Sequence, residues 1–198
     1  EGHQVGLRQA ARTWNAQSCI LAYRYAADSC LMPFYPDPAR ARADAGYLDD
    51  LDLAIFNQFD AIDVAALSTL PASDTGALTR LDDERVTRRQ SEPIILAAGA
   101  SPRLVGWAVD PVAQRPAGGV LIRIDDGPPI WGAIDRPSPA VAEGEETADY
   151  GQSGFAIQIP ADVLPPGDHV ITMQAVTNDR QAVFETSRRG QSVLVRVE

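Results

Sequence analysis

The spacing of the apolar residues is the feature that most limits how this chain can fold. From about Gly76 onward apolar side chains recur at every second position, as in Val120, Ile122 and Ile124. This alternation places one face of a strand in a core and the other in water. Short alternating runs separated by turn sequences are typical of an all-β sandwich. We predict eight or nine strands, at 76–81, 93–98, 103–110, 120–124, 130–131, 155–159, 169–176, 181–185 and 191–197.

Residues before these strands follow helical spacing instead. Side chains at intervals of three and four predict an amphipathic first helix with Trp14 as its core anchor. They are Leu7, Ala11, Trp14, Ser18, Leu21 and Tyr25. Asp37 followed by Pro38 predicts the start of a second helix that ends near Asp49, because aspartate caps a helix and proline suits its first position. The apolar surface expected to dock this helix comprises Leu48, Leu51, Leu53, Ile55 and Phe56.

A segment rich in proline, alanine, serine, aspartate and threonine, residues 71–75, has the composition of a linker or turn. We therefore predict an α+β fold, with a helical unit at residues 1–72 and an antiparallel β-sandwich at residues 73–198. A unit of about 70 residues has a marginal core of its own, so we expect it to dock against the sandwich.

Composition restricts the partners and the source. The net charge is -10 and all 17 basic residues are arginine, scattered along the chain, which argues against a nucleic-acid partner. The absence of lysine indicates a GC-rich bacterial genome. No stretch approaches the roughly 20 apolar residues that span a bilayer. Because the chain begins with Glu1, we expect that an upstream segment, which could include a membrane span, has been removed.

Cys19 and Cys30 are the two cysteines. In one uninterrupted helix they would lie about 16 Å apart, beyond disulfide reach, so a bond requires a break such as Asp28-Ser29 between them. The alternative is a pair of buried free thiols in a cytosolic protein. We favour the disulfide, which indicates an oxidising compartment.

Several short sequences appear in a familiar order. They are Gly106-Trp107-Ala108-Val109-Asp110, Gly118 to Asp125, Arg136-Pro137, Ser153-Gly154-Phe155 and Pro166-Gly167-Asp168-His169-Val170. Over Gly76 to Val197 this order resembles bacterial immunoglobulin-like modules at the extracytoplasmic end of polytopic cell-envelope membrane proteins, some of them glycosyltransferase-like. The segment with Cys19 and Cys30 resembles the region between the last membrane span and that module.

The resemblance implies a periplasmic or surface location, tethered to a membrane part of the same polypeptide or to an envelope protein. It brings no catalytic residues and no cofactor. Pro139 stands where an acidic residue is expected after Arg136-Pro137-Ser138, which puts a ligand contact there in doubt.

The residues themselves give little catalytic chemistry. Ser153 lacks the glycine-x-serine-x-glycine order, and His169 follows a Pro-Gly turn, so we interpret both as structural. The cysteines and histidines are too few and too scattered for zinc. The aspartates at 49, 50 and 52 are expected to face solvent. A weak calcium candidate comprises Asp125, Asp126, Glu145 and Asp149, with Glu143 and Glu146 nearby, although a solvated acidic loop explains the same pattern.

Sugar recognition is the one specific binding hypothesis. Aromatic faces stack on sugar rings, which makes Trp107, Trp131 and Tyr150 candidates if they are exposed. Core packing is the competing interpretation, and it is favoured for both tryptophans, more strongly for Trp107 than for Trp131. We therefore predict a non-catalytic extracytoplasmic accessory domain for docking, assembly or saccharide presentation. The alternative is a stand-alone periplasmic or surface carbohydrate-binding protein.

Overall fold

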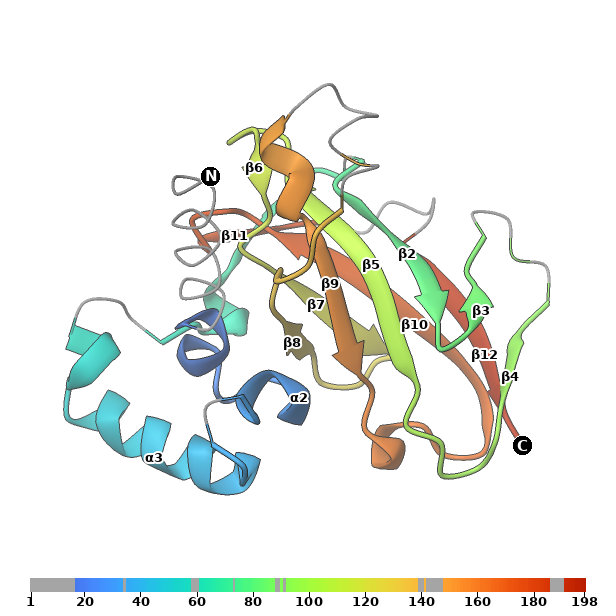
Figure 1. The fold of residues 1–198 in the computed structure, drawn as a ribbon, viewed down its shortest axis with the longest axis horizontal. Coiled ribbons are helices and arrows are strands. Elements are labelled where there is room, and N and C mark those ends of the chain that lie inside the picture. The colour runs from blue at the N-terminus through green and yellow to red at the C-terminus, as the bar shows by residue number, and fades with distance from the viewer. Residues whose placement is uncertain are drawn as a thin grey trace, which may run out of the picture.

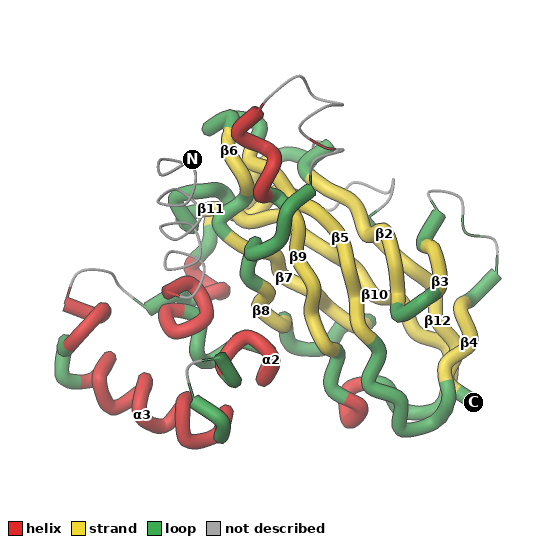
Figure 2. Tube along the Cα trace, viewed as in Figure 1, coloured by secondary structure: helices red, strands yellow, loops and turns green. Residues whose placement is uncertain are grey.

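The computed structural model describes residues 17–33, 35–57, 61–72, 74–87, 90, 92–138, 141, 148–185 and 191–198. Two sheets, with twelve strands in this part of the chain, lie face to face, and the α-helices gather at one side of them (Figures 1 and 2). The fold is therefore mostly β and sandwich-like, with a small helical part, as the sequence predicts in coarse outline.

The first sheet is organised around β10 (Gly167–Val176), which pairs antiparallel with β7 (Gly119–Ile124) on one side and with β12 (Ser192–Val197) on the other. β8 (Ile130–Gly132) extends the sheet beyond β7 in the hairpin that the sequence predicts. The remaining members are β4 (Ile94–Leu96), parallel to β12, β11 (Ala182–Phe184), antiparallel to β10, and β1 (Ser68–Leu70), parallel to β11.

The second sheet is organised around β5 (Arg103–Asp110). β5 lies between β2 (Gly76–Leu81) and β9 (Gly154–Gln158), antiparallel to both. β3 (Glu84–Arg85) pairs with β2, and β6 (Arg115–Pro116) forms a hairpin with β5. The short 3₁₀ helices η3 (Ala148–Gln152) and η4 (Ala161–Val163) flank β9 in the sequence.

Alternation along the strands builds the core between the sheets. Leu104, Phe155, Ile122 and Ile171 are fully or almost fully buried there. Gly106 allows the Phe155 ring to lie against β5, because a Cβ at this position would sit 2.6 Å from Phe155 Cζ. The inward row of β7 is the one expected from the sequence.

The helical unit contains α2 (Asp28–Leu31), α3 (Pro38–Asp50), η1 (Ala54–Asn57) and η2 (Val64–Ala66). The predicted start of α3 is confirmed, because the Asp37 carboxylate accepts hydrogen bonds from Ala39 N at 3.0 Å and Arg40 N at 3.1 Å. Of the predicted first helix, residues 17–21 are described and are helical, whereas Leu7, Ala11 and Trp14 lie outside the described residues.

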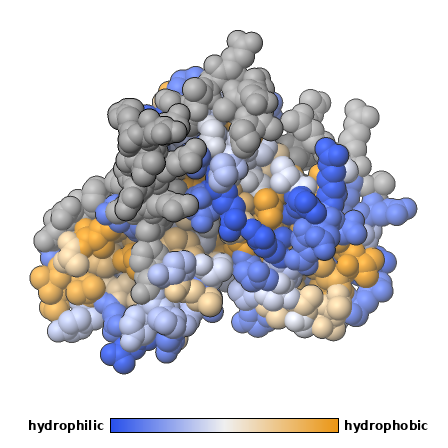
Figure 3. Space-filling model, viewed as in Figure 1, coloured by the Kyte–Doolittle hydropathy of each residue, from blue (hydrophilic) through white to orange (hydrophobic). Residues whose placement is uncertain are grey.

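Only part of the apolar surface predicted to dock α3 is covered. Phe56 is buried, and Leu48 and Ile55 are half-buried. Leu51 and Leu53 are 49% and 46% exposed, because the chain turns through positive φ at Asp52 and again at Ala54. Figure 3 shows the resulting apolar surface over the end of α3 and η1, at the left of the molecule.

The predicted disulfide is present between Cys19 and Cys30, with Cα atoms 5.6 Å apart. The expected position of the helix break was wrong, however. The chain turns between Ala22 and Ala27, and Asp28 already begins α2. Because the chain reverses direction between Ala22 and Ala27, the two cysteines come together.

The helical unit packs on the outer face of the first sheet, which confirms the predicted docking. Its residues Leu21, Phe56 and Ile62 form a second core with Leu121 and Trp131 of the sheet. Val120 and Ile122 point toward the second sheet, whereas Leu121 points the other way, so β7 is buried on both faces.

Most predicted strands lie where expected, and β2 and β5 have the predicted bounds. The short strands β1, β3 and β6 were missed. β1 falls within residues 1–72, yet it pairs with β11 of the first sheet. The chain therefore begins to contribute to the sheets before the 71–75 segment.

Candidate functional site

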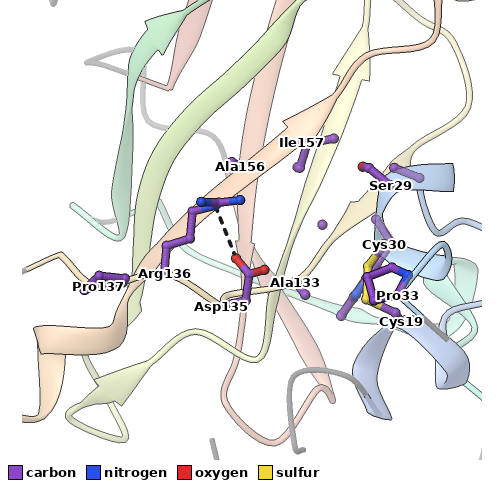
Figure 4. Close-up of a pocket in the computed structure, with 13 residues that line it drawn as sticks. Cys19, Ser29, Cys30, Pro33, Ala133, Asp135, Arg136, Pro137, Ala156 and Ile157 are labelled. Atoms are coloured by element: carbon purple, nitrogen blue, oxygen red, sulfur yellow. Dashed lines mark ion pairs between the residues drawn. A yellow bond between two sulfur atoms is a disulfide. The ribbon is translucent and has the colours of Figure 1, made fainter. Parts of the chain in front are cut away.

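A groove of about 430 Å³ lies where the helical unit meets one side of the two sheets (Figure 4). Cys19, Cys30, Ser29 and Pro33 form one wall, and the end of β8 with β9 forms the other. Polar groups are contributed by Asp135 and Arg136, which follow β8, and by Ser29 of α2. The volume falls within the roughly 300–1,000 Å³ range of small-molecule sites.

The helical wall of the groove is fixed to the edge of the first sheet. Trp131 N donates to Tyr25 O at 2.7 Å and Ala27 N donates to Trp131 O at 3.2 Å, so residues 25–27 add to the outer edge of β8. The Arg42 guanidinium donates to Ala26 O at 2.7 Å and pairs with Asp28 at 2.6 Å, which ties α3 to the same turn. Together with the disulfide, these contacts hold the wall in place.

Asp135 and Arg136 are held at the opposite side by the backbone of β9. Arg136 N donates to Gly154 O and Gly154 N donates to Arg136 O, both at 2.9 Å. The Arg136 Nε lies 3.7 Å from Asp135 Oδ1, a loose ion pair drawn as a dashed line in Figure 4. Loss of hydration raises the pKa of Asp135, and the nearby Arg136 charge opposes this. The pair is half-exposed, so both side chains can meet a ligand.

The free edge of β9 supplies backbone groups as well. Ala108 N donates to Ser153 O and Ile159 N donates to Pro102 O, which sets the alternation of the β5–β9 ladder. In that alternation the backbone of Ala156 points away from β5. No strand in the described part of the chain pairs with Ala156 on that side, and Ala156 lines the groove. Its N–H and C=O therefore face the space between β9 and α2.

The three aromatic residues named as candidates for sugar stacking, on the condition that they are exposed, are buried or half-buried. Trp131 is 0% exposed, because the helical unit covers the outer face of β8, and Tyr150 is 3% exposed in a cluster with Val109 and Val141. Neither ring therefore meets the condition of exposure on which its candidacy depended, and the core packing favoured for Trp131 is observed. Trp107 is half-buried on the outer face of β5 beside this cluster, so the favoured interpretation of Trp107 as core between the sheets is wrong.

The calcium candidate does not assemble in the described residues. Asp125 Oδ2 lies 2.7 Å from His169 Nδ1, and Asp125 Oδ1 accepts from Val170 N at 2.8 Å, so both carboxylate oxygens are engaged. The part of the chain that the structure describes holds no cluster of three or more metal-ligating side chains. Glu143, Glu145 and Glu146 lie outside the described residues, as does the Asp149 side chain.

His169 has a structural environment. Its Nε2 lies 2.7 Å from Pro165 O, which can only accept, while Nδ1 faces the Asp125 carboxylate. Both nitrogens therefore meet acceptors, and the hydrogen bond with Asp125, followed by that with Pro165, raises the pKa of His169. Ser153 is fully buried next to β9 in the other sheet, and no hydrogen bond joins it to His169.

Sequence reasoning missed the groove. Ser29 and Ala156 carry no motif, Asp135 lies in an irregular segment, and Arg136 entered only through the resemblance. A signal was present in Val120-Leu121-Ile122, since three successive apolar residues in a strand indicate burial on both faces. That run could have predicted a covering layer and hence a junction beside β8.

No protein-family model and no curated protein matches this chain. Among solved structures, the endo-beta-1,4-mannanase from Thermotoga petrophila is similar at 10% identity with a TM-score of 0.34. The match covers 83% of this chain and 24% of the mannanase chain, so this chain spans about a quarter of that protein. A TM-score this low carries no conclusion about the present chain. No helix among the described residues is long and apolar enough to cross a membrane.

Proposed function

We propose that this chain is a non-catalytic extracytoplasmic accessory domain of a larger bacterial membrane protein. In this proposal an immunoglobulin-like sandwich is carried on a helical stem and serves docking, assembly or saccharide presentation. Its partner is the membrane part of the same polypeptide or another envelope protein. The proposal rests on the resemblance in sequence and on one structural observation, the shared core between helical unit and sandwich.

Strand order supports the immunoglobulin-like part of the proposal. The path β12-β10-β7-β8 in the first sheet has the order of immunoglobulin strands G, F, C and C′, and β2-β5-β9 in the second sheet has the order of strands A, B and E. The disulfide that joins strands B and F in antibody domains has no counterpart, since the two cysteines lie in the helical unit.

The shared core is the observation that supports the role of the helical unit as a stem. Leu21, Phe56 and Ile62 pack on Trp131, and the backbone of residues 25–27 pairs with β8. A segment fixed by both side chains and backbone moves with the sandwich. The stem would therefore hold the sandwich at a defined position relative to whatever precedes it. The Cys19–Cys30 bond, which persists in oxidising compartments, is compatible with an extracytoplasmic location.

The burial of Ser153 and the hydrogen bonding of His169 support a non-catalytic role. Ser153 is fully buried, and both nitrogens of His169 are occupied by Asp125 and Pro165. Nucleophilic catalysis needs a base that is free to accept a proton from an accessible nucleophile. These residues do not meet that need.

An immunoblot of fractionated source cells, with antibody raised to this chain, tests the proposal. We expect a membrane-associated band far larger than the 21.3 kDa of the chain. A soluble product of the chain's own size would contradict the proposal and favour the stand-alone carbohydrate-binding protein.

A further inference from the structure

The groove presents hydrogen-bond donors and acceptors to the same small space. The Asp135 carboxylate contributes acceptors and the Arg136 guanidinium contributes donors. The backbone of Ala156 contributes one donor, its N–H, and one acceptor, its C=O. Ser29 adds a hydroxyl from the opposite wall. Figure 4 shows Asp135 and Arg136 on one side of the groove and Ser29, Pro33 and the disulfide on the other.

The charges favour an uncharged ligand. Asp135 and Arg136 are adjacent and opposite in sign, and they lie close enough to compensate each other. A strongly anionic ligand would be repelled by Asp135, and a strongly cationic one by Arg136. A neutral molecule with hydroxyl groups can accept from Arg136 and donate to Asp135 at the same time.

The dimensions favour a compact ligand over an extended peptide. A peptide that adds to a sheet edge pairs with several residues of the strand. Here Ala156 and Ile157 are the residues of β9 that line the groove, and α2 forms its other wall. The remaining lining side chains at this end, including Ala133 and Pro137, are small or rigid and leave room for a ring.

We propose that this groove binds one unit of an uncharged saccharide, held by Asp135, Arg136 and the backbone of Ala156. The inference deepens the proposed function by assigning a place for saccharide presentation, and it rests on that function for its biological setting. It uses none of the three aromatic residues that the sequence singled out. Because no exposed aromatic ring among the described residues lines the groove, recognition depends on hydrogen bonds, and we expect a dissociation constant on the order of 1 mM.

The test is an NMR titration of the oxidised 198-residue chain with methyl glycosides of glucose, mannose, galactose and arabinose and with disaccharides of each. We expect at least one sugar to shift the amide resonances of Asp135, Arg136 and Ala156 in a saturable manner. Asp135→Asn and Arg136→Gln should each weaken binding about tenfold or more, because each removes a charge-assisted hydrogen bond. Arg136→Gln keeps the backbone pairing with Gly154, so the groove stays formed.

The matched controls are Asp168→Asn and Arg196→Gln, which change an exposed ion pair between β10 and β12 at 2.6 Å. They should leave the affinity unchanged. Three results would overturn the inference: no saturable shift with any sugar, shifts confined to the Trp107 and Tyr150 surface, or equal loss of affinity in the controls. Saturable binding of an unrelated extended peptide in the groove, without sugar binding, would also overturn it.

The two proposals can fail separately. A membrane-bound native product with no sugar binding removes the saccharide site and leaves the accessory role. Sugar binding by a soluble product of the chain's own size removes the accessory role and leaves the groove.

Discussion

Replacing Trp131 with alanine should destabilise the protein more than any other change at an aromatic residue of the first sheet. The Trp131 ring is fully buried between the sheet and the helical unit, beside its cross-strand partner Leu121 and the stem residues Leu21, Phe56 and Ile62. Buried Trp→Ala changes cost about 3–5 kcal/mol of unfolding free energy. Trp131 Nε1 has no hydrogen-bond partner among the described residues, and removing such a donor recovers about 1–3 kcal/mol. We therefore expect a loss near the lower end, about 3 kcal/mol.

Urea unfolding followed by far-UV circular dichroism measures this loss. With a slope of about 2 kcal/mol per molar urea, the midpoint should fall by roughly 1.5 M. Trp107→Ala is the matched control, because Trp107 is half-buried on the outer face of β5 and should cost about 1–2 kcal/mol. If the Trp131 variant loses no more stability than the Trp107 variant, the second core does not bind the helical unit to the sheet.

Gly119 provides an independent test of the same packing. A Cβ at Gly119 would lie 2.2 Å from Trp131 Cζ2, so Gly119→Ala must displace the ring. Overpacking of this kind costs about 1–3 kcal/mol. Trp131→Phe shortens the ring system and also removes the unpaired Nε1, so the double variant should lose less stability than the sum of the single variants. Strict additivity would show that the two residues do not touch.

Three further predictions concern other parts of the fold. The pKa of His169 is raised in the folded protein, so protonated His169 stabilises the fold fully below about pH 6.5, the pKa in the unfolded chain, and this contribution is lost as the pH rises through the folded pKa. His169→Gln should therefore flatten the decline in unfolding free energy above about pH 6.5. An unchanged slope would contradict the assignment. Reducing the Cys19–Cys30 bond, which closes a loop with a sequence separation of 11, should lower the unfolding free energy by about 3 kcal/mol, whereas an unchanged melting temperature after verified reduction would show that the bond adds nothing. The Gln90 side chain hydrogen-bonds to both the N–H and the C=O of Leu194, at 3.0 and 2.9 Å, and so covers part of the β12 edge. Because an uncovered strand edge can pair with another chain, Gln90→Ala should increase concentration-dependent association in sedimentation experiments. A variant that stays as monomeric as the parent would refute this role.

The parts of the fold with local signals were predictable from sequence. The local apolar pattern and the turn sequences predicted β5 and the β7–β8 hairpin, and the Asp37-Pro38 cap predicted the start of α3. In each of these cases the residues that determine the structure are neighbours in the chain. Short strands such as β1 carry no pattern of their own and form because β11 lies beside them.

The candidate site was not predictable, because it depends on how the helical unit packs. Trp131 alternates with inward residues of its strand and should face water by that rule, yet the helical unit covers it. Asp135 and Ala156 meet only after two sheet edges and α2 come together. Sequence spacing places residues on a face of their own strand, and it does not say which other segment will cover that face.

Native-state hydrogen exchange tests most directly whether the helical unit and the sandwich form one body. The decisive amides are the two that join these parts: Ala27 N, which donates to Trp131 O at 3.2 Å, and Trp131 N, which donates to Tyr25 O at 2.7 Å. If the account is right, these amides exchange through the same global unfolding as Met173 N in the core of the first sheet, with equal protection. Exchange of these amides orders of magnitude faster than that of Met173 would mean that the helical unit detaches while the sandwich stays folded. That result would contradict both the rigid stem and the groove at its junction.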